Sequence, residues 1–441
     1  AIGNQTLYLQ NFATSTDSFN TAVGYQAGRV VSTGVNNTFL GGLSGDANTT
    51  GDDSVAIGYQ ALGANTTGGG NIAIGSGALD ANTTAIHNVG VGTNALGGNT
   101  TGTANVALGH RALLTNTTAS NNTAVGYDSL KANTTGTQNV AVGNDSLKAN
   151  TTGAGNTASG YRALQGNTTA ANNTAFGTDA LYTNTTGASN TAVGKSSLVA
   201  NTTGAYNVAV GQGALDANIS APYNSALGYD ALGANTTGSQ NVGVGSYALR
   251  LNTTGANNTA VGYEALDKNT TGQYNTAMGY KALTSNTTAS FTVAMGYEAL
   301  KLNTTGAGNV GVGQSALYSN TTGTDNTGVG YGVLDASTTG ARNAAIGSGA
   351  GGATTTGPNN VFVGHLAGNY VTPNTTGSEN TMLGSYTYAP ATAIQLNVFG
   401  HAVVGSQGYT TIGISTSDIR AAHGTATWAA VSDQRYKKDI V

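Results

Sequence analysis

One seventeen-residue unit repeats through most of this chain without an insertion. The stretch Asn122–Gln138, NTAVGYDSLKANTTGTQ, is followed directly by NVAVGNDSLKANTTGAG, which has the same length and nearly the same letters. The Gly of the N-T-A-V-G segment recurs every 17 residues from Gly24 to Gly364, which gives 21 copies. An unbroken register over this distance means that each copy occupies an equivalent place in a stack. The sequence therefore predicts an all-β, repetitive parallel β-roll or β-solenoid.

The residues before this reference Gly alternate as a β-strand requires. Position −1 holds a branched or bulky apolar residue, as in Val125 and Ile346, and position −3 holds Thr or Val, as in Thr123 and Val140. Because side chains two apart share one face of a strand, we expect positions −3 and −1 to face the core. The Ala or Gly between them would form the opposite face, which is small enough for another chain to approach closely.

A Leu stands four residues after the reference Gly in 17 copies, from Leu62 to Leu334. We expect it to enter the same core from a second, shorter strand or a turn, so that each unit reads strand, turn, short strand, turn. β-branched residues and Gly at this density exclude a helix. The two outer copies at each end have Gly in place of the Leu, and we expect those copies to face a cap. These residues are Gly28, Gly45, Gly351 and Gly368.

Two Asn positions are as regular as the apolar ones. One opens the strand segment in 19 of 21 copies, Ser54 and Thr292 being the exceptions, and the other heads the Asn-Thr-Thr segment from Asn48 to Asn320. Stacked one per turn, such residues predict ladders of side-chain amides. The Asn-Thr-Thr segment also matches an N-glycosylation sequon, although its turn chemistry explains the same residues.

The amino-acid composition narrows the range of possible functions. Of 441 residues 67 are Gly and only 8% are charged, the net charge is −4, and there is no Cys. We therefore expect no nucleic-acid partner, no membrane span, no disulfide and no cofactor. No metal site is expected either, because the five His residues lie far apart in the sequence. They are His87, His110, His365, His401 and His423.

Two rows of side chains are candidates for a binding or catalytic site. Acidic residues two positions after the Gly form a sparse row that we expect to be solvated, which argues against a polysaccharide-degrading tailspike with paired carboxylates. These acids are Asp128, Asp145, Asp179, Asp230, Glu264 and Glu298. Tyr follows the Gly in several copies, as in Tyr263 and Tyr280. Exposed Tyr can stack on sugars, but we expect these rings to pack along their own row.

The N-[TV]-A-[VI]-G segment followed by Ala-Leu resembles the head repeats of trimeric autotransporter adhesins. The resemblance covers Asn20 to Gly368 and implies a β-roll packed as a homotrimer. The usual unit of that family is shorter, so the Asn-Thr-Thr-Gly segment would be a longer outer loop. A roll that buries one Val and one Leu per seventeen residues also favours association of several chains.

The last ten residues, SDQRYKKDIV, resemble the start of the intramolecular chaperone domain found at the C-termini of phage tail fibres and tailspikes. In that family the domain drives trimer assembly and then cleaves itself off before a Ser, using a Ser/Lys pair. The matching residues are Ser432 and Lys437, which places the cut between Val431 and Ser432. A Ser hydroxyl needs such a neighbouring base. An earlier match, Ser417–Arg420, has Ala422 where the Lys would stand.

These patterns predict four segments. Residues 1–19 are a partial N-terminal repeat or cap, 20–368 the array, 369–431 an irregular β neck, and 432–441 the start of the chaperone. The expected function is a structural or adhesive fibre shaft, homotrimeric and extracellular, on a cell surface or a virion, with a cell-surface glycan or receptor as a further partner. The mature fibre is not expected to be an enzyme. The alternatives are an ice-binding or glycan-binding solenoid; ice binding is disfavoured because the Thr at −3 is expected to face the core.

Overall fold

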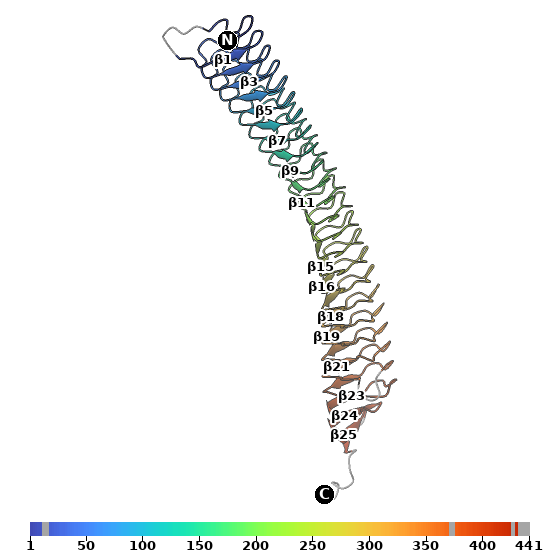
Figure 1. The fold of residues 1–441 in the computed structure, drawn as a ribbon. Coiled ribbons are helices and arrows are strands. Elements are labelled where there is room, and N and C mark those ends of the chain that lie inside the picture. The colour runs from blue at the N-terminus through green and yellow to red at the C-terminus, as the bar shows by residue number, and fades with distance from the viewer. Residues whose placement is uncertain (11–16, 370–374, 425–427, 431–441) are drawn as a thin grey trace. The chain divides into compact units, whose positions relative to one another are not determined.

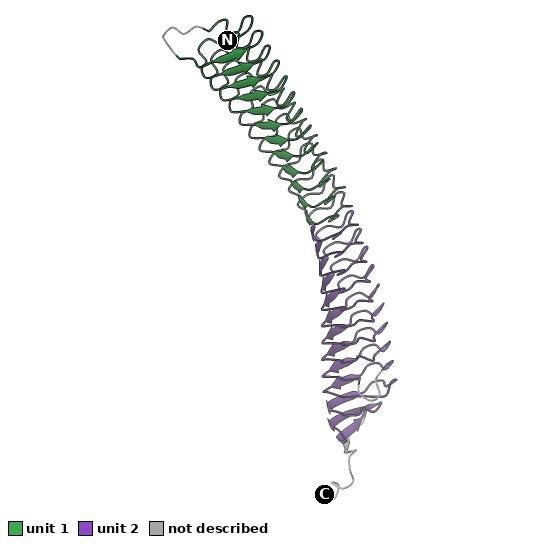
Figure 2. Cartoon of the chain, viewed as in Figure 1, with its two compact units in different colours: residues 1–223 green, residues 224–441 purple. Residues whose placement is uncertain are grey.

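The computed structural model describes residues 1–10, 17–369, 375–424 and 428–430. It divides into two compact units, residues 1–223 and 224–441, each of which is described by itself (Figure 2). The described residues form β-strands, turns and bends and contain no helix. The prediction of an all-β parallel solenoid with 17-residue repeats is confirmed. Each repeat is called a turn below and is numbered by its reference glycine.

Each strand in the repeats is only three residues long, and within a unit consecutive strands stack in register (Figure 1). In unit 1, for example, Thr123 lies opposite Val140 and Ala124 opposite Ala141. The strands of unit 1 are β1 Thr21–Val23, β2 Thr38–Leu40, β3 Val55–Ile57, β4 Ile72–Ile74, β5 Val89–Val91, β6 Val106–Leu108, β7 Thr123–Val125, β8 Val140–Val142, β9 Thr157–Ser159, β10 Thr174–Phe176, β11 Thr191–Val193 and β12 Val208–Val210.

In unit 2 the parallel stack extends beyond the last 17-residue repeat. β22 pairs with β21, and β23 pairs with β22 and β24, although the spacing is no longer 17. β24, β25 and β26 then form an antiparallel end. The strands are β13 Ser225–Leu227, β14 Val242–Val244, β15 Thr259–Val261, β16 Thr276–Met278, β17 Val293–Met295, β18 Val310–Val312, β19 Thr327–Val329, β20 Ala344–Ile346, β21 Val361–Val363, β22 Thr381–Leu383, β23 Asn397–His401, β24 Tyr409–Ile414, β25 Ser417–Ala422 and β26 Trp428–Ala430.

The expected orientation of the strands is wrong. The residue at −2 is buried in all 21 turns, as Ala124 and Ala141 are, whereas no residue at −3 or −1 is buried. The small face is therefore the core face. The interior is narrow and already holds the Leu at +4 and two Asn side chains, so it has room for little more than a methyl group from the strand.

The Leu at +4 is in the core as predicted, but it lies in a hydrogen-bonded bend of the backbone after the strand and not in a second strand. Leu147 is fully buried and has a left-handed φ of +49°, a conformation that costs a bulky residue about 1 to 2 kcal/mol. Its backbone N–H nevertheless donates to the carbonyl of Ala163 in the next turn at 3.0 Å. Burial and this ladder hydrogen bond offset the strain.

The reference glycine is required by the stacking itself. Gly126 has a φ of +134°, and a Cβ on it would lie 2.5 Å from the carbonyl oxygen of Gly143 in the next turn. Any side chain here would therefore push two turns apart. This is why the position never varies through 21 copies.

The glycines that replace Leu near the ends each lie against a core Phe, and Gly28 also lies against Leu7 of the N-terminal segment. At both places the strand supplies a Phe to the core, and the Phe fills the space of two Leu side chains. A Cβ on Gly28 would lie 2.7 Å from Cδ2 of Phe39, and one on Gly351 would lie 2.6 Å from Cδ2 of Phe362. Gly45 contacts Phe39, and Gly368 contacts Phe362, in the same way.

Candidate interaction surfaces

The outward side chains of the strands form an apolar stripe in each unit. We define the strand stripe as positions −3 and −1 of β1–β12 in unit 1 and of β13–β21 in unit 2. Leu108 is 48% exposed, Phe176 56% and Val142 39%. Position −1 is apolar in 20 of the 21 turns, Ser159 being the exception. Because in-register parallel strands stack these side chains directly above one another, each unit presents a long apolar surface to solvent.

The Asn-Thr-Thr segments form a second regular surface. The first Thr hydroxyl donates to the backbone of the next turn, as from Thr134 Oγ1 to the carbonyl of Thr151 at 3.0 Å. The second Thr of each segment is exposed, as Thr135 and Thr152 are. We call these second residues the threonine file. It offers one exposed hydroxyl per turn and a methyl group in each turn except turn 211, where Ser220 stands in place of Thr.

The asparagine side chains lie inside the solenoid, and the predicted ladders are confirmed. Asn150 Nδ2 donates to Asn133 Oδ1 and to the carbonyl of Gly153, both at 2.9 Å. In the other ladder Asn122 Oδ1 accepts from the backbone N–H of Asn139 at 2.9 Å. Since the sequon Asn side chains are fully buried in these bonds, the folded chain cannot present them for glycosylation.

The acids at +2 are not uniformly solvated, so the expectation of a solvated row is wrong for Asp128. Its side chain is 2% exposed and binds Arg111 Nε at 2.7 Å, Lys131 Nζ at 3.4 Å and Lys148 Nζ at 3.5 Å. Burial raises the pKa of Asp128, but the Arg111 hydrogen bonds and the nearby cations outweigh it and lower that pKa overall. Asp179 pairs with Arg162 and Glu298 with Lys301. These acids are ion-pair partners and do not face one another across a cleft.

Three tyrosines of the expected row, all in unit 2, stack on one another. The ring centroids of Tyr263 and Tyr280 are 5.6 Å apart, those of Tyr280 and Tyr297 are 5.2 Å apart, and both pairs are stacked. Stacked rings cover each other's faces and leave their edges to solvent. Sugars stack on open ring faces, so these three stacked rings are poorly placed for glycan binding.

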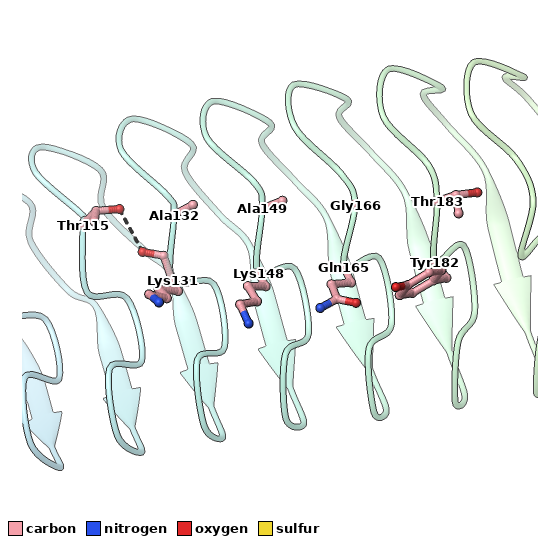
Figure 3. A pocket seen from close by; sticks show the side chains of 9 residues that line it. All are labelled: Thr115, Lys131, Ala132, Lys148, Ala149, Gln165, Gly166, Tyr182 and Thr183. Carbon is pink, nitrogen blue, oxygen red and sulfur yellow. Dashed lines mark hydrogen bonds between the residues drawn. The ribbon is translucent and has the colours of Figure 1, made fainter.

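A groove crosses five turns of unit 1 and was not predicted (Figure 3). Its wall consists of four long side chains at +5, namely Lys131, Lys148, Gln165 and Tyr182. Its floor consists of small residues at +6, namely Ala132, Ala149 and Gly166, and ends at Thr115 and Thr183. The volume is about 700 Å³. The sequence signal was the coincidence of long residues at +5 with small residues at +6 over three consecutive turns.

The predicted self-cleavage residues, Ser432 and Lys437, lie outside the described residues, as does Val431. The earlier sequence match, Ser417–Arg420, lies in β25, where Arg420 Nη2 pairs with Asp418 Oδ2 at 3.0 Å. In the part of the chain that the structure describes, no three His, Asp or Glu side chains gather closely enough to hold a metal ion. The same residues include no helix long and apolar enough to cross a membrane.

Comparisons with known proteins add no relative: no family model, curated protein or solved structure matches this chain.

Proposed function

We propose that this chain is the shaft of a structural, adhesive fibre and that three copies associate through the strand stripe. The observation that carries the proposal is the stripe itself, which leaves an apolar row exposed along each unit of a single chain. Contiguous apolar surfaces of this extent mark interaction sites in proteins that remain dispersed in water. The Ala and Gly side chains that were expected to face another chain lie in the core, and the surface available for association is formed by outward Val, Ile, Leu and Met side chains.

The number of chains and the setting rest on resemblance. The strand motif resembles adhesin heads, which are homotrimers, and the last residues resemble a trimerising chaperone. A fibre of this kind acts outside the cell or on a virion, where a cell-surface glycan or receptor would be its partner. Self-cleavage before Ser432, with Lys437 as the base, remains a prediction. Intact mass spectrometry of a chain extended through a complete C-terminal domain, with and without Ser432→Ala, tests it, because only the chain that keeps Ser432 should end at Val431.

Native mass spectrometry tests the assembly. The expected mass is three times the 43.6 kDa of one chain. Val142→Asp in unit 1 together with Val329→Asp in unit 2 should give monomers, because each places a charge in the stripe. Thr152→Asp in the threonine file is the matched control and should leave the mass unchanged. A monomeric parent, or variants that assemble as the parent does, would overturn the proposal.

A second candidate function is ice binding, and the corrected orientation favours it. The Thr residues at −3, such as Thr123, point outward, and the threonine file repeats once per turn. Regular rows of hydroxyl and methyl groups on a rigid β-surface can order water. Thermal hysteresis of the parent chain that is lost in Thr152→Lys would support this function, and its absence in the parent would exclude it.

A further inference from the structure

The groove of unit 1 has the length and shape for an extended chain. Thr115 and Thr183 lie four turns apart, and four rises of about 4.8 Å give about 19 Å. A volume of about 700 Å³ is within the range of ligand sites. The groove follows the stacking direction, across turns 109 to 177 (Figure 3). This geometry fits a linear molecule that lies along the stack.

The groove has an apolar floor and a polar edge. Lys148 Nζ is held by Asp145 Oδ1 at 2.9 Å and by Asp128, so its alkyl stem is what lines the groove. The floor backbone is satisfied, since the N–H of Ala149 donates to the carbonyl of Gln165 at 3.0 Å. Pyranose rings match such a surface, because their C–H faces pack on alkyl and aromatic groups and their hydroxyl edges form hydrogen bonds.

The side chain of Gln165 favours a sugar over a purely apolar ligand. Its Oε1 is buried and has no hydrogen-bond partner among the described residues. An unpaired buried acceptor costs about 1 to 3 kcal/mol. A sugar hydroxyl could donate to this oxygen once the amide turns toward the groove, whereas an acyl chain would leave it unpaired.

Charge distinguishes between kinds of sugar. Three cations, Arg111, Lys131 and Lys148, are grouped around two acids, Asp128 and Asp145. This ion-pair cluster, whose Lys131 and Lys148 belong to the groove wall, therefore carries one positive charge in excess on a chain whose net charge is −4. A carboxylate on the ligand would compensate that charge.

We propose that this groove binds a linear acidic oligosaccharide, with about one sugar ring per turn over the four rises between Thr115 and Thr183. The proposal deepens the adhesive part of the proposed function and rests on it: the groove would be a receptor-binding site on the side of the shaft. It does not depend on the number of chains.

Calorimetric titration of the parent chain with two matched probes tests the site. The probes are the β-1,4-linked hexasaccharide of mannuronate and its neutral counterpart, mannohexaose. We expect the acidic probe to bind and the neutral one to bind about tenfold more weakly or not at all. If neither probe binds, or if the neutral probe binds as tightly as the acidic one, the proposal is overturned.

Two variants locate the binding. Ala149→Leu fills the floor and should weaken binding of the acidic probe by about tenfold or more. Ala217→Leu, at the same repeat position outside the groove, is the control and should bind as the parent does. Lys148→Met keeps the alkyl stem, removes the charge, and should abolish the preference for the acidic probe. Equal losses in Ala149→Leu and Ala217→Leu would place the binding elsewhere and overturn the proposal.

Native mass spectrometry of the same samples separates this proposal from the proposed assembly. A trimer that binds neither probe overturns the groove alone. A monomer that binds the acidic probe overturns the trimeric shaft alone.

Discussion

The turns in the middle of the array and those near its two ends fill the same core with different residues. Turns 58 to 330 combine Leu at +4 with a small residue at −2, usually Ala, as in Leu147 and Ala141. Near each end a single Phe at −2 stands between two Gly at +4: Phe39 between Gly28 and Gly45, and Phe362 between Gly351 and Gly368. The backbone register is the same in both cases.

This difference shows that the total volume of the core side chains stays the same from turn to turn, whereas the residues that supply it change. Phe39 and Phe362 are fully buried, as the Leu side chains are. A smaller exchange occurs in turn 330, where Val333 occupies the usual Ala position and a Cβ on Gly328 would lie 3.0 Å from its Cγ1. Close packing in so narrow an interior allows a large residue only where its neighbours lose theirs.

The largest expected effect comes from removing an end Phe. Phe362→Ala leaves a cavity that the flanking glycines cannot fill, and should cost about 3 to 5 kcal/mol. Adding Gly351→Leu and Gly368→Leu recreates the central core and should recover most of the loss. Because long arrays do not unfold in one step, hydrogen exchange of the amides of β20–β22 is the measurement. A triple variant as unprotected as the single one would show that the end turns require Phe for another reason.

The reciprocal exchange in a central turn should have a smaller effect. Ala141→Phe overpacks the core between Leu130 and Leu147 and should cost about 1 to 3 kcal/mol. Adding Leu130→Gly and Leu147→Gly transplants the end core into the centre and should restore the protection of β7–β9. If Ala141→Phe alone is neutral, the central interior has spare volume and the comparison fails.

The asparagine ladder at +7 runs from Asn48 to Asn320 and can be extended. The ladder stops at Asn320, because the next turn has Ser337. Both Asn320 Oδ1 and Ser337 Oγ are buried without a hydrogen-bond partner among the described residues. Ser337→Asn should donate to Asn320 Oδ1 and to the carbonyl of Gly340, and stabilise the local turns by about 1 kcal/mol. Ser337→Ala is the control; it removes the hydroxyl without extending the ladder and should not slow exchange to the same degree.

The smallest expected effects concern pH and have opposite signs at two carboxyl groups, Asp128 and Asp335. The pKa of Asp128, in a central turn, is lowered, so its stabilisation is present above the ordinary value of about 4 and is lost as pH falls through the lowered pKa. Asp335 lies nearer the C-terminal end, and burial raises its pKa. Hydrogen bonds from the backbone N–H groups of Asp335 and Ala336 lower that pKa, but burial has the larger effect. The contribution of Asp335 to the free energy of unfolding therefore declines as pH rises from about 4 through the raised pKa.

Two Asn variants measure this contrast by hydrogen exchange at several pH values. Asp128→Asn should destabilise its turns at pH 7 and have less effect at acidic pH. Asp335→Asn should stabilise its turns at neutral pH, and the gain should vanish below the ordinary carboxyl pKa. The same sign for both variants would contradict the assigned directions.

Much of the fold was predictable, because stacking imposes the period. The unbroken spacing of Gly24 to Gly364 predicted a parallel solenoid, the regular Asn positions predicted ladders, and the recurrent Leu predicted the core. Each of these depends only on identical residues lying one turn apart. The groove was harder to predict, since its wall and floor come from five different turns and become one surface only when they stack. The predicted cleavage pair, Ser432 and Lys437, stays a prediction.

The sequence by itself determined the period, the parallel register and the residues that could stack. Only the tertiary structure decided which face of each strand turns inward. A period-two pattern has two phases, and the alternation of Thr123, Ala124 and Val125 is compatible with either. Leu at +4 and two buried Asn side chains already occupy the interior, so the strand can contribute only its smallest residue there. The larger apolar side chains are left outside, on the surface where another chain can cover them.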